Sequence, residues 1–263
     1  MDEILLRSDS NAIATLTLNR PKALNALSEE MLTALQAELD TIANDRSIRA
    51  IILKGAGKVF CAGHDLKQMT AARQVEDGGK AYFNALFQQC GHLMTTITKQ
   101  PQPVIAEVHS IATAAGCQLV ASCDLAIAAE GTRFGVNGIN IGLFCSTPMV
   151  ALTRNIHRKQ AFEMLTTGDF IEANRAAEIG LINRAVPQDA LEAETKALAE
   201  KLASKLGVAV KMGKESFYKQ LEMGLEEAYA FTGANMADNM LFRDTENGVA
   251  AFLEKRKPEW DQN

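Results

Sequence analysis

Hydrophobic positions in the first two thirds of the chain alternate between short apolar runs and stretches of helical period. The short runs predict strands at residues 5–7, 13–18, 50–53, 104–108 and 125–128. Apolar residues at steps of three or four predict a helix from the N-cap Ser28 to Ile42, another over about 81–97, and a third from near Ala115. This alternation predicts an α/β fold with a parallel sheet.

The last third of the chain has mainly the helical period. We interpret Thr147-Pro148 as an N-cap followed by a proline at the first helical position, and we expect one strand near 181–186. From 207 to 260 the pattern is almost entirely helical, with predicted breaks at Gly224, Gly233 and Gly248. We therefore divide the chain into a core, residues 1–206, and a helical C-terminal region, residues 207–263.

Composition narrows the functional classes. The 263 residues are 47% hydrophobic and 22% charged with a net charge of −5, and no basic stripe with interleaved aromatics argues for nucleic acid. No apolar run reaches the roughly 18 residues of a membrane span, and no signal peptide is visible at the start. The five cysteines, without metal-ligand spacing, indicate reduced thiols, so we expect a cytoplasmic protein without a metal site.

Two turns of small residues carry the candidate chemistry. One runs from Phe60 to Leu66 and the other from Thr113 to Gln118, and each follows an apolar run and opens a predicted helix. Small residues let a ligand approach the backbone, and the start of a helix leaves N–H groups unpaired. Two such donors aimed at one point form an oxyanion hole, which stabilises a thioester carbonyl as it becomes an enolate.

These turns belong to a longer set of matching segments, and on that set the chain resembles the crotonase (enoyl-CoA hydratase/isomerase) superfamily. The segments follow in family order at 19–27, 60–66, 112–124, 134–142 and 251–257. The run 142–148 is similar to one branch, the enoyl-CoA hydratase domain-containing proteins of the third type. The resemblance implies a spiral of β-β-α units with a helical C-terminal region that forms trimers or dimers of trimers.

The resemblance also implies residue roles. The backbone N–H groups of His64 and Ala115 would be the oxyanion donors for an acyl-CoA thioester. Coenzyme A would enter as part of the substrate rather than as a resident cofactor, along a channel lined by Lys22, Ala23, Leu24, Ala62, Asp65 and Leu66. Phe252 and Lys255 would close over its nucleotide end from a neighbouring subunit.

The two glutamates that handle water and the α-proton in family hydratases are both replaced. By resemblance their positions are Gln118 and Gly138, and neither residue exchanges a proton near neutral pH. One positioned acid or base contributes about 10²–10⁴ in rate, so the usual hydration is not expected. Glycine at 138 would also leave space, which in some family members is thought to admit bicarbonate as a base.

Three other groups remain as candidates for the missing chemistry. Ser146 occupies a position where several family members have an aspartate, and Cys145 would be a nucleophile if its pKa were lowered near a helix start. The imidazole of His64 would be a catalytic group, because imidazoles titrate near neutrality, or a side chain that lines the channel or contacts phosphate. Asp124 matches a family core aspartate that we expect to bond backbone.

Three functions therefore stay open: an acyl-CoA lyase, isomerase or hydrolase of altered chemistry, a residual enoyl-CoA hydratase, and a non-catalytic acyl-CoA-binding protein.

Overall fold

The centre of the fold is a six-stranded, mostly parallel sheet. The computed structural model describes residues 3–261. The strand order is β1-β2-β3-β4-β6-β9, with only the β1–β2 hairpin antiparallel. The bounds are Leu5–Ser10, Ile13–Leu18, Ala50–Gly55, Val104–Val108, Leu125–Ala129 and Arg184–Val186. The predicted α/β class and parallel sheet are thus confirmed, and β9 is shorter than the strand expected near 181–186.

A second, three-stranded sheet is formed by strands that alternate along the chain with strands of the main sheet. It contains β5 (Ile111–Thr113), β7 (Arg133–Gly135) and β8 (Ile171–Glu172), with β5 parallel to β7. β5 follows β4 closely in the chain and β7 follows β6, and each pair of strands then leads into a helix. This repetition is the predicted spiral of β-β-α units.

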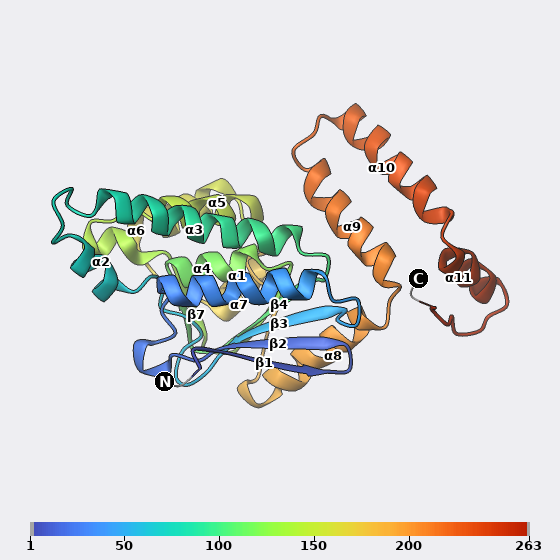
Figure 1. The fold of residues 1–263 in the computed structure, drawn as a ribbon, viewed down its shortest axis with the longest axis horizontal. Helices are drawn as coiled ribbons and strands as arrows, with labels where there is room; N and C mark the ends of the chain where they lie inside the picture. Colours follow the sequence, from blue (N-terminus) through green and yellow to red (C-terminus); the bar gives the residue numbers. More distant parts are fainter. Residues whose placement is uncertain (1–2, 262–263) are drawn as a thin grey trace.

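Helices cover both faces of the main sheet (Figure 1). On one face, Leu16, Ile51 and Leu53 pack in the large core with the helices α1, α3 and α4. On the other face, Ala50 and Ile52 pack against α8. The helices are α1 (Glu29–Ala43), α2 (Leu66–Ala72), α3 (Lys80–Lys99), α4 (Ala115–Ser122), α5 (Ser146–Asn155), α6 (Arg158–Thr167), α7 (Ala173–Glu178) and α8 (Leu191–Ala203).

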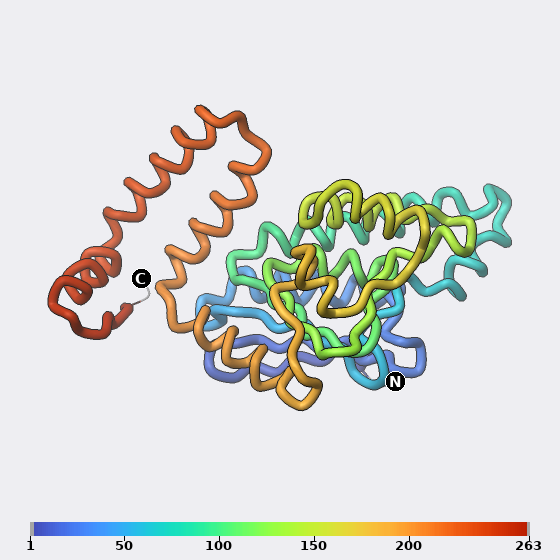
Figure 2. Tube along the Cα trace, turned by 180° about the vertical axis from the view of Figure 1, so that it is seen from behind, coloured from blue at the N-terminus to red at the C-terminus, as the bar shows by residue number. Residues whose placement is uncertain are grey.

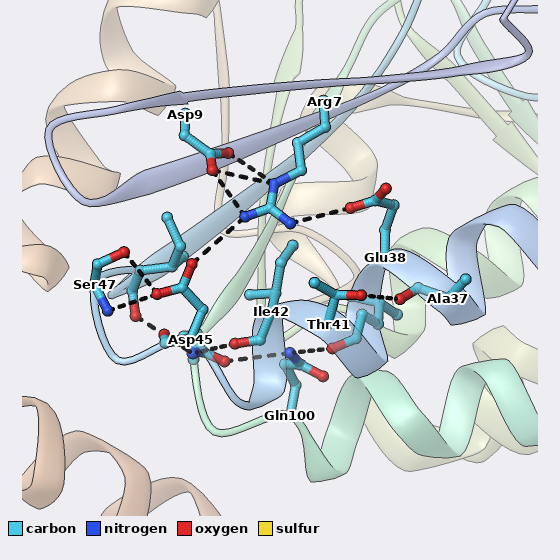
Figure 3. A network of polar contacts seen from close by, with 12 residues as sticks. Arg7, Asp9, Ala37, Glu38, Thr41, Ile42, Asp45, Ser47 and Gln100 are labelled. Atoms are coloured by element: carbon cyan, nitrogen blue, oxygen red, sulfur yellow. Dashed lines mark hydrogen bonds and ion pairs between the residues drawn. The ribbon is translucent and has the colours of Figure 1, made fainter.

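The N-terminal hairpin is fastened to α1 by one guanidinium group (Figure 3). Arg7 on β1 contacts Asp9 on its own strand, Glu38 of α1 at 3.1 Å and Asp45 after α1 at 3.8 Å. Hydrogen bonding to Asp9 raises the pKa of the Arg7 guanidinium above its usual value. The guanidinium therefore ties the sheet edge to the helix layer.

Three helices extend away from this core, and we call residues 207–261 the arm (Figures 1 and 2). They are α9 (Gly207–Gln220), α10 (Leu225–Met240) and α11 (Arg243–Leu253). No residue of α9 or α10 is buried. The projection of the arm begins at the predicted boundary, but the division into two domains stays a prediction.

The arm is attached to the core by a polar cluster. Lys214 of α9 donates to Asp124 Oδ2 at 2.6 Å and to the carbonyl of Ile97 at 2.9 Å. Tyr218 donates to Asp124 Oδ1 at 2.8 Å, and the N–H of Val104 donates to Asp124 Oδ2 at 2.6 Å. Asp124 thus accepts from backbone, as the sequence predicted, and it also holds the arm.

The end of the chain returns to the base of the arm. The indole N–H of Trp260 donates to the carbonyl of Ser204, between α8 and α9, at 3.1 Å. A Cβ on Gly248 would lie 2.9 Å from the Trp260 ring, so the indole packs directly on α11. The predicted breaks at Gly233 and Gly248 are wrong, since both lie inside helices, whereas Gly224 does precede α10.

The start of α5 also differs from the prediction. Its N-cap is Cys145 and its first residue Ser146, so Thr147 is not the cap and Pro148 is the third helical residue. The first four N–H groups of a helix have no intrahelical partner, which explains why proline is tolerated there. Between residues 3 and 261 no helix is long and apolar enough to cross a membrane.

Candidate active site

The two turns of small residues lie against each other. The N–H of Cys61 donates to the carbonyl of Ile111 at 3.2 Å, and the N–H of Thr113 donates to the carbonyl of Cys61 at 3.0 Å. Cys61 and Ala112 thus form an isolated parallel bridge that continues the second sheet. On its other side the first turn is held by the N–H of Leu27, which donates to Gly63 at 2.7 Å.

Glycine is required at two points of this contact. A Cβ on Gly63 would lie 2.9 Å from the Cβ of Ala114 and 3.3 Å from the amide nitrogen of Ala115, and Gly63 has a φ of +93°. A Cβ on Gly116 would overlap the carbonyl oxygen of Cys61. The first turn and the start of α4 therefore approach closely because neither Gly63 nor Gly116 interposes a side chain.

The backbone at the start of α4 is held in an unusual conformation. Ala114, the N-cap, has φ 50° and ψ −120°, and its N–H donates to Gly135 of β7 at 2.9 Å. Such a conformation costs a non-glycine residue about 1–3 kcal/mol and is typical of functional sites. In the described chain no backbone or side-chain oxygen accepts from the N–H of His64 or Ala115.

The predicted coenzyme A channel residues that belong to the core lie around the first turn. Lys22 and Ala23 belong to the short 3₁₀ helix η1 (Pro21–Ala23), and the carbonyl of Leu24 accepts from the N–H of Ala62 at 3.1 Å. Leu66, the first residue of α2, is half exposed at 52%. These residues therefore form one accessible rim beside the two turns.

The carboxylate of Asp65 serves this rim structurally. It caps α2 by accepting from the N–H groups of Lys67 and Gln68, at 3.0 and 3.4 Å. It also accepts from Arg20 at 3.1 Å. Asp65 therefore fixes the exit of the first turn and is neutralised by a neighbouring cation.

Gln118 is buried on the second turn of α4. It is 3% exposed, and its Oε1 lies 4.0 Å from the thiol of Cys90 on α3. Burial and the nearby Cys61 raise the pKa of Cys90 to about 12, so this neighbour stays protonated. The thiol that contacts the Gln118 side chain is thus uncharged.

The space expected at Gly138 is filled. A Cβ there would overlap the carbonyl oxygen of Leu143 and lie 2.9 Å from the Sγ of Cys145. The loop is anchored nearby, since Thr113 donates to the side chain of Asn137 at 2.7 Å and Leu143 donates to Gly138 at 3.0 Å. A side chain at 138 would therefore meet the backbone of the following loop, whereas a bicarbonate base beside Gly138 stays a prediction.

Comparison with known proteins decides the family. The sequence profile of the enoyl-CoA hydratase/isomerase family matches residues 8–263. The chain belongs to this family. It is 46% identical over 250 residues to the human enoyl-CoA hydratase domain-containing protein 3, mitochondrial. The matched region covers 95% of this chain and 81% of the relative. It is 32% identical to the short-chain-enoyl-CoA hydratase of Clostridium acetobutylicum, over 100% of this chain and 99% of the relative.

Solved structures confirm the crotonase fold. A crystal structure of an enoyl-CoA hydratase from Mycobacterium smegmatis matches with a TM-score of 0.95 at 53% identity, covering 98% of this chain and 99% of that chain. The human domain-containing protein 3 matches with a TM-score of 0.93 at 44% identity, covering 98% and 100%. The branch indicated by residues 142–148 is thus among the close relatives. The expected cytoplasmic location stays a prediction, and the human relative is named as mitochondrial.

Cys145 would be a nucleophile only if its pKa were lowered, and the structure does not meet this condition. The thiol is 6% exposed, and burial raises its pKa rather than lowering it. Ser146 is exposed, and its hydroxyl donates to the carbonyl of Phe144 at 3.5 Å. Neither side chain shows the environment of an activated nucleophile.

The imidazole of His64 is more enclosed than the sequence suggested. Its ring packs edge-on against Phe87 of α3 at 5.6 Å, and burial lowers its pKa. The Nε2 atom is buried without a hydrogen-bond partner in the described chain. No sequence pattern indicates this packing, because Phe87 lies on a different predicted helix.

Phe252 and Lys255 lie at the far end of the arm. In both views α11 and the α2 end of the core are at opposite ends of the molecule, so one chain does not bring these residues to its own rim (Figures 1 and 2). Phe252 is 83% exposed.

In residues 3–261 the five cysteines are unpaired, and no group of three or more metal-binding side chains is found.

Proposed function

We propose that this protein binds an acyl-CoA thioester and polarises its carbonyl between the N–H groups of His64 and Ala115, as an enzyme of the hydratase/isomerase type. The approach of Gly63 to the start of α4 carries this proposal, since a Cβ there would lie 3.3 Å from the Ala115 nitrogen. Unclaimed donors at a helix start can stabilise a developing oxyanion. Membership of the family supports a CoA thioester as the ligand.

The usual two-glutamate hydration is not part of this proposal. Gln118 carries no titratable group, and a side chain at Gly138 would collide with the Leu143 carbonyl. The reaction is therefore a lyase, isomerase or hydrolase step of altered chemistry, or a hydration served by another base. A non-catalytic acyl-CoA-binding protein is the second candidate. It is favoured because neither Gln118 nor Gly138 supplies an acid or a base.

The test is exchange of the α-protons of acyl-CoA thioesters in deuterated water, followed by mass spectrometry. The wild type is compared with Gly63→Ala and with Gly131→Ala as the matched control. Both glycines have positive φ, but the control has no atom within 4 Å of its added Cβ. Both variants are therefore strained by their backbone, and only Gly63→Ala also crowds the donors.

We expect wild type and Gly131→Ala to incorporate α-deuterium above the rate without enzyme, and Gly63→Ala to lose at least 100-fold of that rate. Removing one oxyanion donor typically costs about 10²–10³. Saturable thioester binding without any exchange would establish the binding-protein candidate instead.

The arm adds a proposal on assembly. Its helices expose large apolar residues at 73% or more of their surface, namely Leu225, Tyr229, Met236, Leu241, Phe252 and Leu253. Large apolar side chains exposed in this number are typical of a protein interface. We infer a homotrimer or a dimer of trimers in which the arm of one subunit covers a neighbour and places Phe252 and Lys255 over its coenzyme A.

A further inference from the structure

The tautomer of His64 follows from the one hydrogen bond that its ring makes in the described chain. Nδ1 lies 3.3 Å from the carbonyl oxygen of Leu27. A carbonyl oxygen only accepts, so Nδ1 carries the proton and donates. Nε2, across the ring, is then a lone-pair acceptor, and it is buried with no donor in the described chain. Buried polar atoms are almost always paired, so an unpaired one calls for an explanation.

The surroundings keep this imidazole neutral. The titratable groups on its own turn are Cys61 and Asp65, and Asp65 is paired with Arg20 at 3.1 Å. Those on other elements are Glu29, Glu30, Tyr82 and Cys90. In the described chain none of their side chains makes a hydrogen bond to Nε2. The ring packs against Phe87, and burial lowers its pKa, so Nε2 is unprotonated at neutral pH.

The distance from the thioester oxygen to the point where the ring is attached follows from the backbone. If the His64 N–H holds the thioester oxygen, the Cα of the same residue lies within about 4 Å of that oxygen. The imidazole is thus attached at the reacting end of the acyl group. The family's two usual proton carriers are absent from the same site, where Gln118 is not titratable and Gly138 is filled.

We propose that His64 Nε2 is the base of this site, accepting the proton of a water molecule that adds to the β-carbon of a 2-enoyl thioester. This inference rests on the proposed function. As the water oxygen bonds the β-carbon, the electrons of the double bond move to an enolate held by the two N–H donors. The imidazolium then returns the proton to the α-carbon, and the net change is addition of water across the double bond. The reverse sequence dehydrates a 3-hydroxyacyl thioester.

The test compares wild type, His64→Asn and the matched control His92→Asn, which changes an exposed histidine on α3. Asparagine keeps the backbone N–H of residue 64 but removes the base. Hydration of crotonyl-CoA and its pH profile are measured, together with the absorption shift of bound cinnamoyl-CoA, a conjugated thioester whose spectrum moves to longer wavelength when its carbonyl is polarised.

We expect His64→Asn to keep the absorption shift and to lose at least 100-fold in hydration, which is the contribution of one general base. The wild type and His92→Asn should show an acidic limb in kcat/KM below about pH 6.5 that the residual rate of His64→Asn lacks. Two results would overturn the role of the imidazole but leave the proposed function standing. In both, the wild type shows the absorption shift; in one it does not hydrate crotonyl-CoA, and in the other His64→Asn hydrates it at the wild-type rate. Absence of the shift in wild type would overturn the proposed function itself.

Discussion

Lys214 on the arm and Asp124 in the core form an ion pair of 2.6 Å whose side chains are only 7% and 14% exposed. Asp124 directly follows the segment that ends α4, so the fastening of the arm is close to the helix that begins at Ala115. Burial lowers the pKa of Lys214, and the Asp124 carboxylate opposes that shift. The pair therefore connects the arm to the segment that follows α4 through largely enclosed polar contacts.

Replacing Lys214 by methionine should destabilise the protein by about 3–5 kcal/mol, because it leaves the Asp124 carboxylate buried without its cation. Urea unfolding at one fixed protein concentration measures the change. Lys219→Met is the matched control on the same helix, because the side chains of Lys219 and its partner Glu215 are each 54% exposed. We expect this variant to lose less than about 1 kcal/mol of stability. Equal losses for both variants would contradict the structural role of the buried pair.

Returning a carboxylate to the site should succeed at Gln118 and fail at Gly138. Gln118→Glu preserves the shape of a buried side chain, and we expect crotonyl-CoA hydration to rise at least 10-fold, within the range of one added acid or base. Gly138→Glu should give no increase and should lower stability by about 1–3 kcal/mol through overpacking against Leu143.

Gly213→Glu, on α9, is the control for the charge of this second variant, because no atom lies within 4 Å of its added Cβ and its φ is not positive. Hydration is followed by loss of the enoyl absorbance, and stability by urea unfolding. A hydratase gain in Gly138→Glu would show that the loop yields to the new side chain.

The apolar face of the arm predicts the mass of the protein in solution. Three chains of 28.5 kDa give about 86 kDa, and a dimer of trimers twice that. The double variant Met236→Asp/Leu241→Asp should shift the mass measured by light scattering to that of one chain, since charges on an interface are costly to bury. Val75→Asp, at an exposed apolar position in the α2–α3 connection, should leave the mass unchanged. A monomeric wild type would refute the assembly.

Buried thiols predict a loss of stability at alkaline pH. Burial raises the pKa values of Cys61, Cys90 and Cys117 from 9.0 to about 12. A pKa raised in the folded state gives stability that is full below about pH 9 and is lost as the pH rises towards 12. Each thiol contributes a slope of about 1.4 kcal/mol per pH unit in that window.

The free energy of unfolding, measured with urea between pH 8 and 11 under reducing conditions, checks this slope. Cys117→Ala lowers the whole curve by its cavity cost and should flatten the slope by one thiol's contribution. Parallel curves for the variant and the wild type would contradict the assignment.

Much of the scaffold follows from hydrophobic patterning, since β2 and β4 lie at their predicted bounds and α4 begins at Ala115 as expected. The second sheet escapes prediction because β5 and β7 have three residues each, too few to show a period. The predicted breaks at Gly233 and Gly248 failed because helices tolerate an isolated glycine at about 1 kcal/mol.

The candidate site was also predicted only in part from the sequence. Small residues predicted the two turns, and the structure brings Gly63 against Ala114 as a close backbone contact requires. What fills Gly138 is a backbone carbonyl, that of Leu143, and no side-chain pattern reports where a carbonyl points. The buried Nε2 of His64 depends likewise on Phe87, which is distant in sequence.

The sequence contains one tryptophan, and the fold places it where the chain end meets the root of the arm. The emission of Trp260 is therefore an intrinsic optical probe of that junction, with no competing indole elsewhere in the chain. A change in its wavelength or quenching on adding a CoA thioester would report movement of the arm without any label, and would do so in real time during a single mixing experiment.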